Sequence, residues 1–271
     1  MRIKCLSITI VGISLLFLSC QKDDFIENID VTVSMPENTY SKGAEVQAVL
    51  DKYVGLGIPG VIICIDDPVN GFWAGASGKA SIEENSDMTK SHINSIGSIT
   101  KTYINVLTLK LVESGHITLD EPISTYLPSN IRQNVKNSTI ITVRQLMNHS
   151  SGLSDFVDDT RLNLLMLDNN FSGFTENDFL DAIYRSAVLF TPGERYSYSS
   201  TNTYLLSHII DYAMGQSHAV LLSDSILNPN NYDYTYYKNY PGFPKPDSRF
   251  INKVSQISKA AVFFPSAVKG L

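Results

Sequence analysis

The chain has 271 residues, of which 43% are apolar and 18% are charged. This composition is that of a globular protein with enough apolar residues for a sizeable core, and it excludes long disordered regions. The formal charge of −6, together with the lack of any basic cluster, argues against a nucleic-acid partner.

The first twenty residues have the layout of an export signal. Arg2 and Lys4 precede an apolar stretch, residues 8–18, which is followed by Ser19-Cys20. The apolar stretch is shorter than the roughly 20 residues that a membrane-spanning helix needs, so it is typical of a secretory signal. The ending Leu-Phe-Leu-Ser-Cys resembles the lipobox of bacterial lipoproteins, which implies cleavage after residue 19 and a lipid on Cys20. The alternative is a plain secretory signal that is cut elsewhere.

Three segments are therefore expected. Residues 1–19 would be a lipoprotein signal peptide, residues 20–43 a polar, flexible tether, and residues 44–271 the folded domain. The lipid would anchor the exported domain to the bacterial cell envelope, at the periplasmic or the surface face of the outer membrane. No other contact with a membrane is expected, and no oligomeric state is predicted.

Cysteine usage agrees with this organisation. Cys5 lies in the signal and Cys20 would carry lipid, so only Cys64 remains and no intramolecular disulfide can form. Cys64 stands in an apolar run, which predicts a small buried side chain. No cysteines and histidines have the spacing of a zinc site, and neither a metal nor another cofactor is expected.

Within the domain, the apolar pattern changes along the chain. Helical spacing predicts a helix at 44–53, and β-rich runs predict a hairpin of 60–65 with 72–76 around the turn Asn70-Gly71. Residues 81–95 are polar and loop-like. Helices are predicted from residue 99 to Ser114-Gly115, at 142–147, at 177–185, and at 204–214 ahead of Gly215. Asn, Tyr and Pro are frequent at 228–250, which favours a long surface loop.

The pattern Ser-x-x-Lys at the start of a predicted helix is the first candidate site. A lysine at i+3 lies on the same helix face as the serine, and the first helical turn has unpaired N–H groups that favour negative charge. Three such pairs occur, at Ser19, Ser98 and Ser266, but only Ser98 with Lys101 heads a long amphipathic helix. The pair supplies a hydroxyl nucleophile and an amine; the alternative is an N-cap serine with a solvated lysine.

Tyr198 is the second candidate. It follows the turn Pro192-Gly193 and precedes a helix, with Ser200 two residues later. A tyrosine near a lysine ammonium has a lowered pKa and serves as a general base when it is ionised. The alternative is that Tyr196 and Tyr198 are packing aromatics with solvated hydroxyls.

Several of these segments together resemble one family. The segment Ser95-Ile-Gly-Ser-Ile-Thr-Lys-Thr102 is similar to the nucleophile motif of class C β-lactamases, DD-carboxypeptidases and related esterases. Pro192-Gly193 followed by Tyr198-Ser-Ser200 is similar to their Tyr-x-Asn motif. Two more segments also match the family's pattern: residues 115–122 and 141–153.

The resemblance implies an α+β fold, with an antiparallel sheet flanked by helices and a separate helical region. It implies that Ser98 forms an acyl-enzyme, that Lys101 and Tyr198 handle the proton, and that Ser200 positions the substrate. The substrate would be a small molecule or a peptidoglycan peptide whose reacting group is a peptide, β-lactam or ester carbonyl.

The chain departs from the family pattern at two places. Ser200 stands where asparagine is usual, and the family's third motif, Lys or His followed by Thr/Ser-Gly, does not occur. The domain is therefore expected to be incomplete at its C-terminus and to lack late strands. His116 and His149 lie in turns and are expected to be structural, since no Gly-x-Ser-x-Gly elbow accompanies them. The alternative function is a non-catalytic family member, or a lipoprotein that binds the cell wall or a surface partner.

Overall fold

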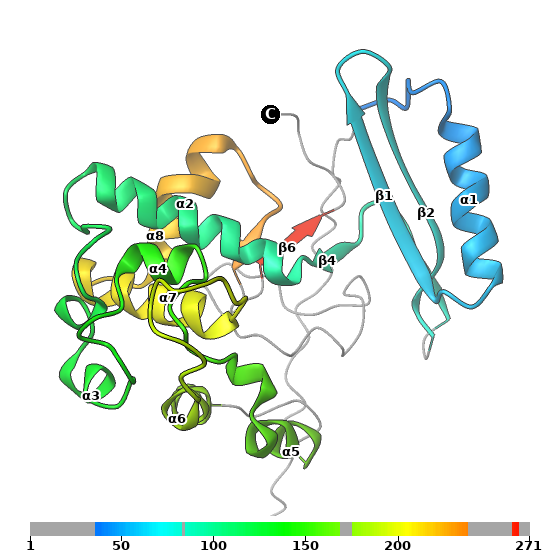
Figure 1. Cartoon of the computed structure of the whole chain (residues 1–271). Helices are drawn as coiled ribbons and strands as arrows, with labels where there is room; N and C mark the ends of the chain where they lie inside the picture. The colour runs from blue at the N-terminus through cyan, green and yellow to red at the C-terminus, as the bar shows by residue number, and fades with distance from the viewer. Residues whose placement is uncertain (1–35, 83–84, 169–174, 238–261, 266–271) are drawn as a thin grey trace, which may run out of the picture. The chain divides into compact units, whose positions relative to one another are not determined.

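The computed structural model describes residues 36–82, 85–168, 175–237 and 262–265 (Figure 1). The expected signal peptide, Cys20 and most of the expected tether lie outside the described residues. What is described is an α+β fold, as the sequence predicts, and it consists of a helix-backed hairpin and a helical part with a second small sheet.

A helix and a β-hairpin follow one another near the start of the described chain, as predicted. Helix α1 (Gly43–Gly55) is followed by β1 (Gly60–Asp67) and β2 (Gly71–Ser81), which pair antiparallel from Gly60 opposite Gly78 to Asp67 opposite Gly71. The Asp67 carboxylate accepts hydrogen bonds from the backbone N–H groups of Val69 and Asn70 and so closes the turn. Gly71 has φ +99°, which a residue with a Cβ rarely adopts.

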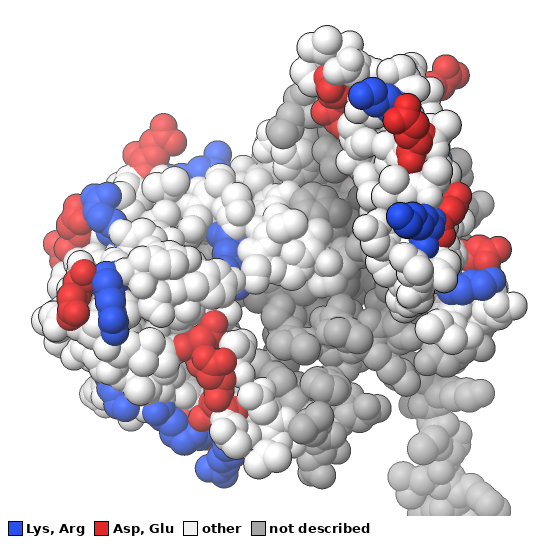
Figure 2. All heavy atoms as spheres, turned by 45° about the vertical axis from the view of Figure 1, so that its right-hand side comes forward, with Lys and Arg blue, Asp and Glu red and all other residues white. Residues whose placement is uncertain are grey.

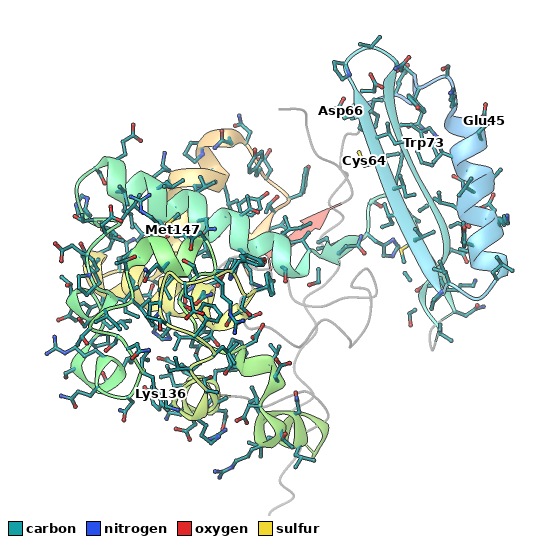
Figure 3. The ribbon with its side chains drawn as sticks, in the orientation of Figure 1. Glu45, Cys64, Asp66, Trp73, Lys136 and Met147 are labelled. Carbon is teal, nitrogen blue, oxygen red and sulfur yellow. The ribbon has the colours of Figure 1, made fainter. Side chains whose placement is uncertain are left out.

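One face of the hairpin packs on α1. Trp73 lies between β2 and α1 (Figure 3), so close that a Cβ on Gly43 would lie 2.4 Å from the indole. Cys64 belongs to the other face, because it pairs with Ala74 whereas Ile65 pairs with Trp73. The prediction of a buried Cys64 is therefore wrong: the thiol is exposed, since α1 covers only the opposite face.

The edge of β2 is occupied by two short segments. At one end, the side-chain amide of Asn38 donates to the carbonyl oxygen of Ala74 and accepts from its N–H, and Thr39 bonds to Phe72. At the other end β2 pairs with β3 (Ser86–Asp87). Residues 38–40, which the sequence assigns to the flexible tether, thus belong to the folded domain because they take the place of an edge strand.

The helical part is built around α7 (Ser200–Met214). Helix α7 packs against α2 (Thr100–Glu113), α4 (Val143–Met147) and α8 (His218–Leu222). Three more helices complete this part: α3 (Ser129–Arg132), α5 (Thr160–Asp168) and α6 (Glu176–Arg185). Four apolar side chains of α7 are fully buried, namely Leu205, Leu206, Ile209 and Ile210. The centre of the apolar core therefore lies along this helix.

Local capping signals mark the start of α4 and the ends of α2 and α7. Thr142 and Gln145 form a reciprocal capping box at the start of α4. Gly115 and Gly215 follow α2 and α7 with φ of +77° and +60°, the left-handed conformation that favours glycine after a helix. Helix α7 begins at Ser200, four residues earlier than its apolar spacing indicates, because its first turn is polar.

A second sheet has the order β4-β6-β5, from β4 (Ile93–Ser95), β5 (Tyr236–Tyr237) and β6 (Val262–Pro265). Asn94 pairs with Phe264, and Tyr236 pairs with Phe263, both antiparallel. The sequence predicts loops at 81–95 and 228–250 and no late strand. Strands this short have no periodic pattern of their own, and their partners lie far away in the chain.

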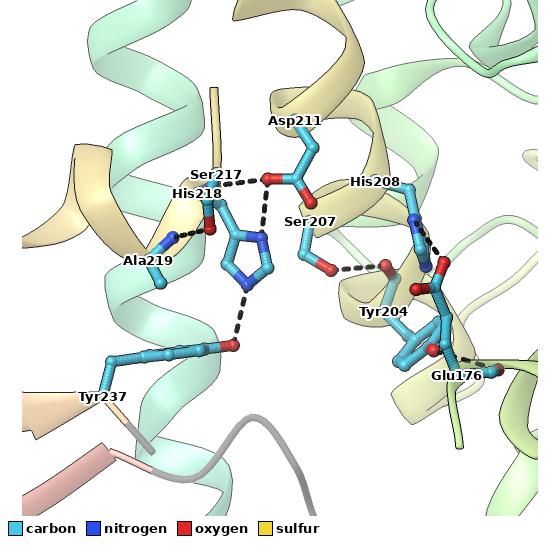
Figure 4. Close-up of polar contacts among 9 residues, drawn as sticks. All are labelled: Glu176, Tyr204, Ser207, His208, Asp211, Ser217, His218, Ala219 and Tyr237. Carbon is cyan, nitrogen blue, oxygen red and sulfur yellow. Dashed lines mark hydrogen bonds and ion pairs between the residues drawn. The ribbon is translucent and has the colours of Figure 1, made fainter. Parts of the chain in front are cut away.

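Buried polar contacts hold β5 to the helices (Figure 4). His218 Nδ1 lies 2.8 Å from Asp211 Oδ1, and its Nε2 lies 2.9 Å from the hydroxyl of Tyr237, which is only 6% exposed. The Asp211 carboxylate also accepts the backbone N–H of His218. The end of α7, the start of α8 and β5 are therefore joined by one network.

The visible surface in Figure 2 has basic and acidic side chains interspersed, with no extended patch of one sign. Among the described residues, no helix has the length and apolar character needed to cross a membrane.

Candidate active site

Ser98 lies at the entrance to α2. It is the central residue of the 3₁₀ turn Gly97–Ile99, which follows β4 by one residue and leads directly into α2. Gly97 has φ +51°, so a glycine suits the point where the chain turns from strand to helix. The Ser98 side chain is exposed, and its N–H belongs to the first turn of the helical segment, where backbone donors have no partner within the helix.

Lys101 lies one turn later on the same face of the helix. Its Nζ donates a hydrogen bond to Ser98 Oγ at 3.1 Å. The predicted i to i+3 arrangement therefore brings the amine into contact with the hydroxyl.

Tyr198 reaches the same atom from a segment 100 residues away. Its hydroxyl lies 2.9 Å from Ser98 Oγ, and the Lys101 ammonium lies 5.1 Å from the centre of its ring. Burial raises the pKa of the Tyr198 phenol, but its hydrogen bonds to Lys101 and Ser98 and the Lys101 charge lower it by more. The pKa of Tyr198 is therefore below its ordinary value of 10, which favours the phenolate that a general base requires.

The loop that carries Tyr198 is tied to the loop after α4. The N–H of Gly193, at φ +88°, donates to the Ser150 carbonyl oxygen at 2.8 Å, and the N–H of Ser197 donates to the His149 carbonyl oxygen at 2.9 Å. Immediately after Tyr198 the chain enters α7. A turn, a neighbouring loop and a buried helix thus determine where the phenol lies.

Ser200 is placed differently from the other three predicted residues. Its backbone N–H donates to Asp155 Oδ2 at 2.9 Å at the start of α7. In the part of the chain that the structure describes, its side chain makes no hydrogen bond to Ser98, Lys101 or Tyr198. The structure brings those three together and leaves the substrate-positioning role of Ser200 as a prediction.

Two residues of this site were not identified as such from the sequence. The His149 ring lies 4.7 Å from the Tyr198 ring, and Asn202, which is fully buried, lies 3.1 Å from His149 Nδ1. From the sequence, His149 is expected to be structural, and Asn202 has no predicted role. Residues 141–153 matched a family segment, which was the one signal that pointed to this loop.

The arrangement suits nucleophilic catalysis. A hydroxyl within hydrogen-bond distance of both an amine and a phenol of lowered pKa is the geometry that activates a serine. Among the described residues, no three histidine, cysteine, aspartate or glutamate side chains lie together as a metal would require.

Comparison with known proteins identifies the family. The Beta-lactamase family model matches residues 46–267. Protein flp of Staphylococcus aureus (strain N315) is 30% identical over 154 residues, which cover 56% of this chain and 30% of that protein. The putative penicillin-binding protein PbpX of Bacillus subtilis (strain 168) is 22% identical over 236 residues, or 83% of this chain and 55% of that protein.

Solved structures show the same fold. A D-stereospecific amidohydrolase from Streptomyces sp. superposes with a TM-score of 0.66 at 24% identity, covering 83% of this chain and 69% of that one. The D-amino acid amidase of Ochrobactrum anthropi SV3 gives 0.67 at 25% identity, covering 82% and 65%. The chain therefore belongs to the β-lactamase family, a family of serine hydrolases. It spans about half the length of PbpX and less than a third of that of Protein flp.

Proposed function

We propose that this chain is a serine hydrolase that forms an acyl-enzyme on Ser98. The observation that carries the proposal is that Lys101 Nζ and the Tyr198 hydroxyl both lie within hydrogen-bond distance of Ser98 Oγ, at 3.1 and 2.9 Å. Every part of this chemistry is supplied by side chains and backbone, so no cofactor is invoked.

The reaction follows from these contacts. The Tyr198 phenolate, held by the Lys101 ammonium, takes the proton of Ser98 as Oγ attacks the substrate carbonyl. The bond between Oγ and the carbonyl carbon forms, and the carbonyl oxygen becomes an oxyanion. The phenol then gives the proton to the leaving group as its bond to carbon breaks. In the second half-reaction the same groups take a proton from water as it attacks the acyl carbon. The bond from that carbon to Ser98 Oγ then breaks, Oγ receives the proton and the carboxylic acid leaves.

Stabilisation of the oxyanion is the other requirement. The N–H of Ser98 belongs to the first turn of the helical segment, where the unpaired backbone donors of a helix start favour negative charge. A missing oxyanion donor typically lowers kcat by about 10²–10³, so this N–H is expected to contribute strongly.

For the substrate, we propose a small amide, peptide, β-lactam or ester. By their names, one protein of similar structure is a D-amino acid amidase and another is a D-stereospecific amidohydrolase, so D-amino acid amides are the first amide substrates to try. Ser98 is exposed and the Tyr198 side chain is 45% exposed, which supports access by a group at the end of a larger molecule such as a cell-wall peptide.

For the location, we propose export and lipid anchoring through Cys20. The proposal is supported by the order of basic residues, apolar stretch and Ser19-Cys20 in the sequence. Fractionation of cells that express the chain and its Cys20→Ser variant tests it. The unsubstituted chain is expected with the membranes, and an equal distribution of the two would contradict lipid anchoring.

Covalent labelling tests the enzymatic proposal. The full chain, purified in detergent, is incubated with a fluorescent penicillin, a D-alanine amide or a p-nitrophenyl ester, and adducts are found by intact mass. An adduct is expected on Ser98, absent in Ser98→Ala and retained in Ser266→Ala, whose serine belongs to another Ser-x-x-Lys match. A folded chain that forms no adduct and releases no product from any of the three would instead be a non-catalytic binding protein of the family.

A further inference from the structure

His149 makes three contacts with Tyr198 and the two residues that flank it. Its carbonyl oxygen accepts the N–H of Ser197 at 2.9 Å, and its Nδ1 accepts the N–H of Ser199 at 3.3 Å. These are the residues immediately before and after Tyr198. The His149 ring also lies against the Tyr198 ring, with centres 4.7 Å apart and planes inclined by 30°. One residue thus holds the backbone on both sides of the phenol and supports its ring.

The conformation of His149 is itself unusual. Its φ is +60°, a region that few residues other than glycine adopt, although Asn, Asp and His are enriched there. Such a conformation is strained, and it persists where the surroundings determine it. In this loop it lets the carbonyl oxygen and the ring of the same residue both reach the Tyr198 segment.

The protonation state of His149 follows from the groups that donate hydrogen bonds to its ring. Nδ1 faces the Ser199 N–H and the Asn202 Nδ2 amide at 3.1 Å. Asn202 is oriented by Ser151, whose hydroxyl donates to Asn202 Oδ1 at 2.6 Å, so its amide nitrogen is the atom turned to the histidine. Nδ1 is therefore an acceptor and the ring is neutral with its proton on Nε2.

The surroundings of His149 favour this neutral form. Burial and the charge of Lys101 lower the pKa of His149, and the contact with the Ser199 backbone and the charge of Asp155 oppose them only in part. A neutral His149 ring adds no second positive charge beside Lys101.

We propose that His149 is a positioning residue for the reaction: its carbonyl oxygen and Nδ1 accept the N–H groups of the two residues that flank Tyr198, and so hold the phenol on Ser98. The inference rests on the proposed function of Ser98 and Tyr198. It assigns His149 no contact with the substrate and no proton transfer.

Two substitutions separate this role from a merely structural one. Both His149→Gly and His149→Asn suit a positive φ and keep the carbonyl oxygen. Asparagine also offers Oδ1 at the same branch point as Nδ1 of histidine, whereas glycine leaves the Ser199 N–H and the Asn202 amide without that acceptor. His116→Gly is the control, because His116 is exposed and bonds to Ser114 in a different turn.

The first measurement is the acylation rate at saturating substrate, with the folded fraction checked by circular dichroism. His149→Gly is expected to lower this rate by about 10–100-fold with little change in KM, since a misplacement of about 1 Å costs up to 10². His149→Asn should keep most of the rate and His116→Gly all of it. A folded His149→Gly protein with the normal rate, or an equal loss in His149→Asn and His149→Gly, would overturn the proposal.

The second measurement does not depend on catalysis. The ionisation of Tyr198 is followed by ultraviolet absorbance as the pH is raised. The part of the titration that belongs to Tyr198 is the part that is lost when the Tyr198→Phe substitution is combined with each variant. His149→Gly should move this ionisation to higher pH, because the phenol drifts from the Lys101 ammonium. An unchanged titration would contradict positioning, even in a chain that no substrate acylates. If the titration shifts as expected but Ser98 is never acylated, the proposed function fails and the positioning stands.

Discussion

Tyr198→Phe is the sharpest test of the site, because it removes a single oxygen. Among the residues that the structure describes, that oxygen has hydrogen bonds to Ser98 and Lys101 only, and Tyr198 is 45% exposed. The phenylalanine ring keeps the contact with His149. Surface changes of this kind usually alter the free energy of unfolding by less than about 0.5 kcal/mol, so the fold is expected to be unaffected.

The rate, in contrast, should fall steeply. General base catalysis is typically worth about 10²–10⁴ in rate. At about 1.4 kcal/mol for each factor of ten, this corresponds to an activation free energy raised by roughly 3–5 kcal/mol. The loss is expected in the acylation step, because the phenol contacts the nucleophile directly.

The pH dependence adds a second signature. The pKa of Tyr198 is lowered, so the phenolate accumulates as the pH rises through a range below the ordinary value of 10. Acylation by the unsubstituted chain should therefore increase with pH over this range. In Tyr198→Phe this increase should be absent.

The assay is the second-order rate of acylation by a chromogenic ester or a fluorescent penicillin, together with thermal unfolding. Tyr196→Phe is the matched control: Tyr196 lies on the same loop, is 66% exposed, and contacts His149 edge-on at 6.0 Å. It should keep the normal rate. Equal rates for Tyr198→Phe and Tyr196→Phe would refute the role assigned to the Tyr198 hydroxyl.

Two further predictions concern stability. Asp159 accepts two hydrogen bonds from the Arg185 guanidinium, at 2.9 and 3.1 Å, and these hold the pKa of Asp159 below its usual range. A carboxyl whose pKa is lowered by folding stabilises the fold at pH values above its unfolded pKa, near 3.9. Asp159→Asn should therefore lower the free energy of unfolding by about 1 kcal/mol at pH 7. The difference from the unsubstituted chain should disappear as the pH falls below the lowered pKa of Asp159. Urea unfolding at pH 7 and pH 3 checks this, and an equal cost at both would contradict it. Tyr237→Phe leaves His218 Nε2 without its buried partner and should cost about 1–3 kcal/mol in the same assay, whereas an unchanged midpoint would mean that the network of Figure 4 does not hold β5.

Much of the fold was predictable because its signals are local. Helical periodicity located α1, α2, α6 and α7, and Thr142, a residue type that favours the N-cap, marked the start of α4. The hairpin of β1 with β2 followed from two apolar runs around Asn70-Gly71. Each of these signals arises from residues within a few positions of one another, so the order of residues is enough to recognise it.

The second sheet and the exposure of Cys64 were not predictable in this way. Strands β4, β5 and β6 have two to four residues each and are defined by partners far along the chain. Cys64 lies in an apolar run that is typical of a buried strand, yet α1 covers only the opposite face of the hairpin. Burial depends on which elements pack together, and the run itself does not contain that information.

One part of the candidate site was likewise predictable from the sequence, and another part depends on tertiary packing. The residue order alone determined the Ser98–Lys101 pair, because three positions on one helix bring two side chains together whatever the rest of the chain does. It also singled out Tyr198 as a candidate. Only the packing of α7 against α2 and α4 brings Tyr198 to Ser98 across 100 residues and places His149 against it. The physical reason is that a hydrogen bond forms over about 3 Å, a distance that local spacing can set within one helical turn and only tertiary packing can set between distant segments.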